Sequence, residues 1–263
     1  MIDAAIVGCG LIGDKRAASL QRHGARIVAV HDVDTGRAAA MADRWGGAVA
    51  PSLDALLEAR PDLVVVATDH ASLCDVGATV AAAGCHLLLE KPGGRTAAEL
   101  RQVQHAAERS GVTVRVGYNH RFHPSFLRMR ELGAAERFGP LLHVRARYGH
   151  GGRIGYEREW RADRARSGGG ELIDQAVHLI DLTRFVTGDD VSLAFAELRT
   201  DFWAMDVEDN AFLALRPRRG GFAWLHASWT EWKNLFSFEV AWQTAKFEVI
   251  GLGGSYGVER LTF

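Results

Sequence analysis

The chain has 263 residues, of which 48% are hydrophobic and 24% are charged, and its formal net charge is −1. This balance is typical of a soluble globular protein, and it gives no electrostatic reason to expect nucleic acid or an acidic membrane as a partner. No apolar run reaches membrane-spanning length, and the first residues, MIDAAIVG, show no signal-peptide pattern. Cys9, Cys74 and Cys85 lack metal or redox spacing. We therefore expect a cytoplasmic protein with reduced thiols and no metal.

The first 118 residues alternate short apolar runs with helical patterns. The predicted strands are residues 3–8, 26–32, 62–68, 85–91 and 112–118, and the predicted helices are residues 11–24, 35–46, 71–84 and 96–111. Nearly continuous apolar strands separated by helices indicate a parallel sheet covered on both faces. We expect a doubly wound α/β domain of the Rossmann type over residues 1–118.

The pattern changes after NHRFHP, residues 119–124. A helix is predicted near residues 171–187, and strands are predicted at 141–149, 193–203, 209–216, 221–232, 236–242 and 246–251. Short polar connections such as PRRGG, residues 217–221, indicate an open, mainly antiparallel sheet. We therefore expect a second, α+β domain over residues 119–263.

The segment AIVGCGLIG carries Gly8, Gly10 and Gly13 in G-x-G-x-x-G spacing between a predicted strand and a predicted helix. The first glycine permits a tight turn, the second lets the backbone approach a pyrophosphate, and the third allows close helix–strand packing. We expect the pyrophosphate at the start of the helix, near Leu11 and Ile12. The alternative is a strand–helix junction that binds no ligand.

Asp32 ends the second predicted strand, nineteen residues after Gly13. A carboxylate there accepts hydrogen bonds from the ribose hydroxyls and repels a 2′-phosphate, so NAD is favoured as the cofactor. Arg37 lies nearby and is able to accommodate a phosphate, which keeps NADP as the less favoured alternative. Thr68 ends the third apolar strand and is also predicted to contact the cofactor.

The fourth apolar strand ends in EKP, with Glu90 and Lys91. Ligands in open α/β sheets bind beyond the carboxyl ends of the strands, so we expect Glu90 at the cofactor and Lys91 at both cofactor and substrate. A cationic Lys91 would stabilise a developing alkoxide. The alternative is an ordinary surface lysine at the start of a loop.

Residues 168–181, GGGELIDQAVHLID, predict an amphipathic helix in which Asp174, His178 and Asp181 form one polar stripe at i, i+4 and i+7. Oxidation of a secondary alcohol requires a base that titrates near neutral pH, and histidine suits this role. We interpret His178 as the catalytic base or acid, Asp174 as its orienting or substrate-binding partner, and Asp181 as either structural or a residue that supports these groups without contacting the ligand. The alternative is a satisfied polar network in a helix–sheet interface.

Five further residues are predicted to contact a ligand. Asn119 and Arg121 lie at the domain crossover, where they either reach the cofactor or substrate or, for the arginine, hold the two domains together. Tyr148, Trp160 and Arg161 suit a sugar pocket, because aromatic rings stack on sugar C–H groups and arginine binds oxygen or phosphate. Their alternative is ordinary packing.

An open sheet with one apolar face is most simply covered by self-association. We therefore expect a homo-oligomer, a dimer or a tetramer, formed through the C-terminal sheet. The tryptophans assigned to the sheet face or to this subunit interface are Trp203, Trp224, Trp229, Trp232 and Trp242.

The motifs GCGLIG, EKP, GYNHRFHP and GGGELIDQAVHLIDL, in this order and at these separations, together resemble the Gfo/Idh/MocA oxidoreductases, the family of glucose-fructose oxidoreductase and inositol dehydrogenase. The resemblance extends from Ala4 to about Gly188 and continues more loosely beyond. It implies a Rossmann domain, an open C-terminal sheet often used for oligomerisation, and hydride transfer between a nicotinamide and a carbon of a sugar, cyclitol or sugar derivative. Lys91 matches the family's cofactor- and substrate-contacting lysine, and Asp174 and His178 match its D-x-G-x-H pair.

Residues 148–174 are also similar to family members that act in nucleotide-sugar and surface-polysaccharide chemistry. Three features depart from the family pattern. TDHASL, residues 68–73, replaces T-P-N-x-x-H, and Ala176 replaces a glycine, which adds a methyl group where the helix is expected to approach the nicotinamide. Family members also generally continue well past Phe263, so we expect the C-terminal domain to be short.

Two other functions remain open. Some members of this fold are NAD-dependent glycosidases, which oxidise a ring carbon transiently, eliminate the aglycone and reduce the product. The second alternative is a regulator that senses a nucleotide without turnover. Such a protein needs no proton relay, so the predicted catalytic residues argue against it.

Overall fold

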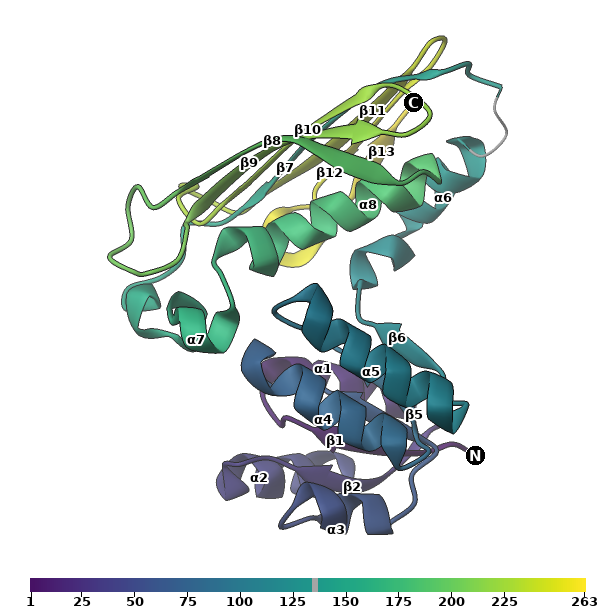
Figure 1. Ribbon diagram of the computed structural model, residues 1–263, viewed down its shortest axis with the longest axis vertical. Helices are drawn as coiled ribbons and strands as arrows, with labels where there is room; N and C mark the ends of the chain where they lie inside the picture. Colours follow the sequence, from purple (N-terminus) through teal and green to yellow (C-terminus); the bar gives the residue numbers. More distant parts are fainter. Residues whose placement is uncertain (134–136) are drawn as a thin grey trace. The chain divides into compact units, whose positions relative to one another are not determined.

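The computed structural model describes residues 1–133 and 137–263, and the chain divides between Gly117 and Tyr118 into two units. The N-terminal unit is a six-stranded parallel sheet in the order β3-β2-β1-β4-β5-β6 (Figure 1). Its strands are β1 (Asp3–Val7), β2 (Arg26–His31), β3 (Ala48–Val49), β4 (Leu63–Val66), β5 (His86–Leu89) and β6 (Val114–Val116). This is the strand order of dinucleotide-binding domains, and it confirms the predicted doubly wound fold.

Helices cover both faces of this sheet. They are α1 (Leu11–Arg22), α2 (Thr35–Trp45), α3 (Leu53–Glu58), α4 (His70–Ala82) and α5 (Ala97–Ser110). Side chains of α1 and α2 pack against one face, with Ala17 and Met41 at the centre, and side chains of α3, α4 and α5 pack against the other. Residues 47–61 were not predicted to hold regular structure, yet they form β3 and α3. Both elements are too short to show a periodic pattern.

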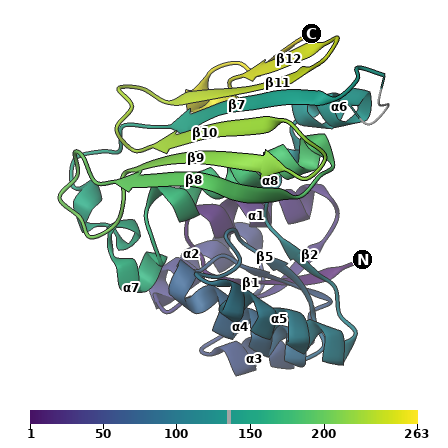
Figure 2. The same ribbon diagram turned by 45° about the horizontal axis from the view of Figure 1, so that its top comes forward.

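The C-terminal unit is a seven-stranded sheet in the order β13-β12-β11-β7-β10-β9-β8 (Figure 2). Its strands are β7 (Leu141–Gly149), β8 (Val191–Arg199), β9 (Asn210–Pro217), β10 (Phe222–Ser228), β11 (Leu235–Trp242), β12 (Lys246–Ile250) and β13 (Arg260–Thr262). All neighbouring strands run antiparallel except β7 and β10, which are parallel. The predicted mainly antiparallel sheet is thus confirmed, with β13 as an addition.

Helices α6 (Pro124–Gly133) and α8 (Val177–Thr187) lie on one face of this sheet and close its core. The unit also holds short helical segments: η1 (Asn119–Phe122), η2 (Tyr156–Arg158), η3 (Trp160–Ala162), α7 (Arg164–Ser167) and, near the C-terminus, η5 (Gly254–Tyr256). Predicted site residues lie in η1 and η3. In the described part of the chain, no helix is both long enough and apolar enough to cross a membrane.

The helix predicted near residues 171–187 begins with a π-helical turn, η4 (Leu172–Ala176), before α8 continues in α geometry. The Ala176 methyl group is fully buried in the core between helix and sheet. The residue that departs from the family's glycine therefore contributes to the packing of this unit.

The five tryptophans assigned to the sheet face or to a subunit interface divide into three groups. Trp224 lies on the sheet face opposite α6 and α8, where its ring stacks on Phe195. Trp229 and Trp242 are buried within the unit, so the prediction of a subunit interface is wrong for these two. The remaining pair, Trp203 and Trp232, follow strands that end earlier than predicted, β8 at Arg199 and β10 at Ser228.

Candidate active site

The glycine-rich turn between β1 and α1 has the geometry that a dinucleotide requires. Gly8 has φ +92°, and a Cβ atom there would lie 2.5 Å from the carbonyl oxygen of Ala67. A Cβ at Gly13 would lie 2.1 Å from the carbonyl oxygen of Gly8. A Cβ at Gly10 would meet nothing within 4 Å. Gly8 and Gly13 are thus required by the fold, whereas Gly10 faces open space that suits a ligand.

The N-terminus of α1 differs from the other helix starts in residues 1–117, all of which the structure describes. Side chains of Asp34, Ser52, Asp69 and Thr96 cap α2, α3, α4 and α5 by accepting a backbone N–H bond. Helix α1 starts after Gly10 and has no side-chain cap. Its first N–H groups and its dipole therefore suit a phosphate group.

Asp32 lies beside this turn at the end of β2. One carboxylate oxygen, Oδ2, accepts the N–H of Cys9 at 2.6 Å, and the other, Oδ1, accepts the N–H of Asp34 at 2.8 Å. These bonds fix the carboxylate next to the glycine turn, where the predicted ribose contact requires it. Arg37 is exposed and lies 3.4 Å from Asp34, so its charge is partly neutralised.

Two other predicted cofactor contacts follow β4 and β5. Thr68 donates through Oγ1 to the carbonyl oxygen of Asp69 at 3.1 Å, and Asp69 in turn caps α4. The aspartate that replaces the family's proline thus starts this helix. Glu90 is buried and accepts a hydrogen bond from Arg16 Nε at 2.5 Å, which ties α1 to the end of β5. Lys91 follows directly and is half-buried.

In the C-terminal unit, His178 projects from the first turn of α8 into an aromatic environment and is 4% exposed. Its ring stacks on His120 at a centroid distance of 4.0 Å and an interplanar angle of 13°. Tyr118 and Tyr148 contact it edge-on, at 5.9 Å and 6.2 Å between centroids. His120 lies in the NHRFHP motif, but the sequence alone did not indicate that it pairs with His178.

Asp174 lies in the π-helical turn and is 6% exposed. Arg161 Nε is 3.4 Å from its carboxylate, and the guanidinium also lies 4.6 Å from the centre of the Trp160 ring. The structure therefore brings together three residues that the sequence assigned to a sugar pocket or to catalysis. An arginine held between a carboxylate and an aromatic ring presents its remaining N–H groups to a hydroxyl-bearing ligand.

Arg121 and Asp181 form a separate ion pair within the C-terminal unit. Arg121 Nε donates to Asp181 Oδ2 at 2.7 Å, and a second short bond joins the same two side chains. This bond is the main cause of the raised pKa of the Arg121 guanidinium. The pair ties η1 to α8, as expected for a structural Asp181. Asn119, at the start of η1, is exposed.

Two polar side chains near Asp174, His150 and Tyr256, were not indicated by the sequence. Burial lowers the pKa of His150, against the opposing charge of Asp174, and His150 Nδ1 accepts the N–H of Gly152 at 2.9 Å. Burial raises the pKa of Tyr148 well above its ordinary value, with Tyr256 and Asp174 adding to the effect. These residues come from segments far apart in the chain, and no local spacing identifies them.

Gln175 adds a buried acceptor to this environment. Its Oε1 atom has no hydrogen-bond partner among the described residues, while its side chain hydrogen-bonds Tyr256. A buried amide oxygen without a donor is costly, so a ligand hydroxyl or an ordered water is expected to bind it.

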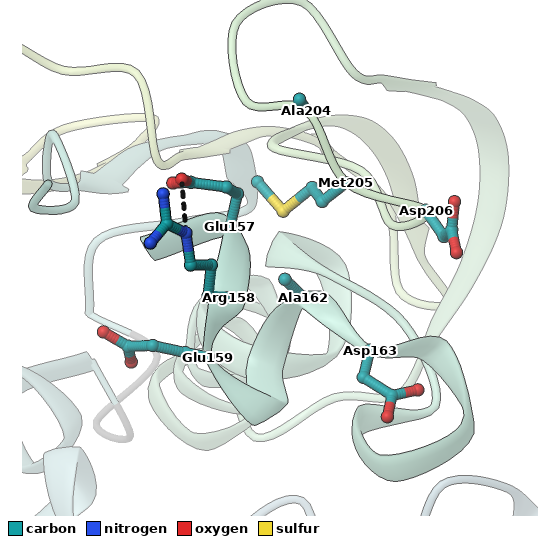
Figure 3. A pocket seen from close by; sticks show the side chains of 8 residues that line it. All are labelled: Glu157, Arg158, Glu159, Ala162, Asp163, Ala204, Met205 and Asp206. Carbon is teal, nitrogen blue, oxygen red and sulfur yellow. Dashed lines mark ion pairs between the residues drawn. The ribbon is translucent and has the colours of Figure 1, made fainter. Parts of the chain in front are cut away.

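A pocket of about 280 Å³ opens beside η2 and η3 (Figure 3). Its lining carries four carboxylates against one arginine; the lining residues are Glu157, Arg158, Glu159, Ala162, Asp163, Ala204, Met205 and Asp206. Glu159 Oε2 lies 3.7 Å from Arg161, the same guanidinium that contacts Asp174. Arg161 therefore lies near both Asp174 and Glu159, one of the residues that line this pocket.

Comparison with known families identifies both units. Residues 2–118 match the oxidoreductase family described as an NAD-binding Rossmann fold, and residues 126–256 match the GFO/IDH/MocA C-terminal domain. The chain belongs to the Gfo/Idh/MocA family. The resemblance drawn from the motifs is thereby confirmed, and the N-terminal unit is an NAD-binding Rossmann domain.

Relatives of known name cover most of the chain. It is 31% identical to inositol 2-dehydrogenase 2 of Saccharopolyspora erythraea over 82% of its length, and spans 63% of that protein. It is 28% identical to D-glucoside 3-dehydrogenase of Escherichia coli over 85% of its length, and spans 69% of that protein. Among solved structures, GenD2 from gentamicin A biosynthesis, in complex with NAD, superposes with a TM-score of 0.88 at 29% identity, over 94% of this chain and 71% of that one.

Proposed function

We propose that the protein is an NAD-dependent oxidoreductase that transfers hydride between the nicotinamide and a carbon of a sugar, sugar nucleotide or cyclitol. The observation that carries this proposal is the glycine turn, where α1 begins without a side-chain cap opposite open space. Relatives named as dehydrogenases of inositol and of D-glucoside support the substrate class.

The residues present fit NAD. Gly8, Gly10 and Gly13, with the N–H groups of Leu11 and Ile12, hold the pyrophosphate. The Asp32 carboxylate binds the adenine ribose and disfavours NADP. Five other residues complete the predicted cofactor contacts: Arg37, Thr68, Glu90, Lys91 and Asn119. Bound NAD supplies the hydride acceptor, or in the reverse direction the donor.

The chain's own side chains manage the proton. His178 takes the proton from the substrate hydroxyl in the oxidative direction and returns it in the reductive direction. Asp174, with Arg161 against it, fixes the substrate or the imidazole, and cationic Lys91 stabilises the developing negative charge on the reacting oxygen. Arg121, Tyr148 and Trp160 complete the proposed substrate contacts.

We assign the two domains different roles. Residues 1–118 bind NAD, and residues 119–263 bind substrate and form the oligomer. Exposed Phe195 and Trp224, stacked on the sheet face opposite α6 and α8, support self-association through this face. Free, buried Cys9, Cys74 and Cys85 support a reducing cytoplasmic location.

The test combines calorimetric binding of NAD with NADH absorbance across a panel of cyclitols, free sugars, glycosides and nucleotide sugars. The proposal expects NAD to bind and one substrate class to produce NADH. NAD binding without any turnover would favour a sensing role, and cleavage of a glycoside without release of NADH would favour a glycosidase. If NAD did not bind, the proposal would be contradicted.

A further inference from the structure

Glu208 contacts the start of the helix that carries Asp174 and His178. It lies two residues before the start of β9 at Asn210 and is 8% exposed. Its Oε1 atom accepts the N–H of Gly170 at 3.0 Å and the N–H of Leu172 at 3.1 Å. Its backbone carbonyl accepts the N–H of Glu171 at 2.9 Å. One residue thus binds three consecutive backbone N–H groups at the beginning of this helix.

The contact requires the glycine at 170. A Cβ at Gly170 would lie 1.9 Å from the Glu208 carbonyl oxygen, so only glycine lets the two backbones approach this closely. The first N–H groups of a helix lack partners within the helix and attract negative charge. A buried carboxylate from the connection between β8 and β9 therefore takes the place of a local cap, and it fixes where the helix begins.

The start of this helix determines how Asp174 is presented. The Asp174 N–H donates to the Gly170 carbonyl oxygen at 3.0 Å, and the π-helical turn from Leu172 to Ala176 follows at once. A π turn contains one residue more than an α turn and is uncommon outside functional sites. If the start of the helix relaxed into α geometry, Asp174 would shift around the helix axis relative to His178.

We propose that Glu208 is a positioning residue, which holds the first turn of this helix so that Asp174 lies against Arg161 and in working register with His178. The inference rests on the proposed function for its kinetic consequence only. The structural part, that Glu208 fixes the amides of Gly170 and Leu172, stands independently of any substrate.

The neighbouring residue Asp209 also binds backbone N–H groups through its carboxylate, but in a different segment of the chain. Its carboxylate accepts the N–H groups of Asp201, Phe202 and Trp203 at 2.8–3.0 Å. These bonds outweigh burial and lower the pKa of the Asp209 carboxyl. The two adjacent carboxylates therefore bind different segments of the chain. Asp209 organises a loop, while Glu208 organises the helix with the proposed catalytic groups.

The test uses three variants of Glu208. Glu208→Ala removes the acceptor, Glu208→Asp keeps the charge but shortens the reach, and Glu208→Gln keeps an oxygen that is able to accept both N–H bonds. Asp189→Asn is the matched control, since the Asp189 carboxylate also accepts backbone N–H groups, from Asp190 and Arg219, but beyond the opposite end of α8.

Hydrogen exchange of the Gly170 and Leu172 amides and steady-state kinetics are measured on each folded variant. We expect exchange to accelerate roughly tenfold to a hundredfold in Glu208→Ala, less in Glu208→Asp, and little in Glu208→Gln. We expect kcat to follow the same order, with a loss of about tenfold or more in Glu208→Ala. The KM for NAD should stay unchanged in these variants, and the control variant should keep wild-type exchange and kinetics.

Unchanged exchange in Glu208→Ala and Glu208→Asp would overturn the inference, and so would accelerated exchange with wild-type kcat per folded molecule. If the wild-type protein turns over no substrate, the proposed function fails. In that case, accelerated exchange at Gly170, Leu172 and Asp174 still supports the positioning of the helix, and unchanged exchange still overturns it. If Glu208→Ala did not fold, it would be excluded from the comparison, because Glu208→Asp and Glu208→Gln provide the same test.

Discussion

The two units build their candidate binding groups in different ways. In the N-terminal unit the cofactor site consists mainly of backbone: a glycine turn, the uncapped start of α1 and one carboxylate, Asp32. In the C-terminal unit the site consists of side chains from η1, β7, η3 and the η4–α8 helix, such as His120, Tyr148, Arg161 and His178. The first arrangement depends on local conformation, whereas the second depends on packing between distant segments.

This difference predicts that substitutions in the C-terminal unit affect chemistry without affecting cofactor binding. The largest effect is expected for His178→Ala, which should lower kcat by roughly two to four orders of magnitude because the general base is lost. NAD affinity, measured by calorimetry, should stay near the wild-type value. His226→Asn is a suitable control, since His226 also stacks on an aromatic ring, Phe212, at 4.2 Å. Wild-type turnover in His178→Ala would remove this residue from the mechanism.

Substitutions in the glycine turn should have the opposite effect. Gly10→Ala should raise the Kd for NAD about tenfold to a hundredfold, because its methyl group enters the open space assigned to the pyrophosphate. Its melting temperature should stay unchanged, since a Cβ there meets nothing within 4 Å. Gly13→Ala should also lower the melting temperature, because its Cβ would collide with the Gly8 carbonyl oxygen. Calorimetry and thermal unfolding distinguish the two, and equal NAD affinity in Gly10→Ala and wild type would contradict this placement of the cofactor.

A smaller effect is expected at the ribose. Asp32→Asn should narrow the preference for NAD over NADP by about tenfold, because the 2′-phosphate is no longer repelled. The asparagine oxygen accepts only one of the two N–H groups, of Cys9 and Asp34, that the carboxylate binds, so thermal unfolding is measured to confirm that the variant is folded. The ratio of kcat/KM for the two cofactors measures the preference, with Asp34→Asn as the exposed neighbouring control. An unchanged ratio would rule out Asp32 as the discriminating residue.

The smallest effect concerns stability in mild acid. Burial lowers the pKa values of His150 and His226 in the C-terminal unit below the ordinary value of 6.5. The unfolded chain therefore binds more protons than the folded chain as the pH falls below 6.5, and the free energy of unfolding should decrease in that range. Thermal unfolding at about pH 7.5 and about pH 5.5 measures this, and His226→Gln should flatten the dependence. An identical slope in that variant would exclude a contribution from His226.

The elements that carry a local pattern were predictable from the sequence. Apolar strands, glycine spacing and the Asp174–His178 stripe each reflect physical rules that act over a few residues. The π-helical turn was not predictable, because the periodicity of Leu172–Ala176 is compatible with an α-helix, and contacts with distant residues, such as that of the Leu172 N–H with Glu208, are not part of this local pattern. The stacking of His120 on His178 and the buried oxygen of Gln175 likewise depend on tertiary packing.

The most direct test of the central claim follows deuterium from a substrate labelled at the reacting carbon. The substrate is taken from the class identified with the panel, and the released cofactor is analysed by mass spectrometry. We expect reduced NAD to leave the enzyme carrying the deuterium, and we expect His178→Ala to produce almost no labelled cofactor. A substrate converted with its deuterium retained, or a released cofactor without the label, would contradict the assignment as an NAD-dependent dehydrogenase.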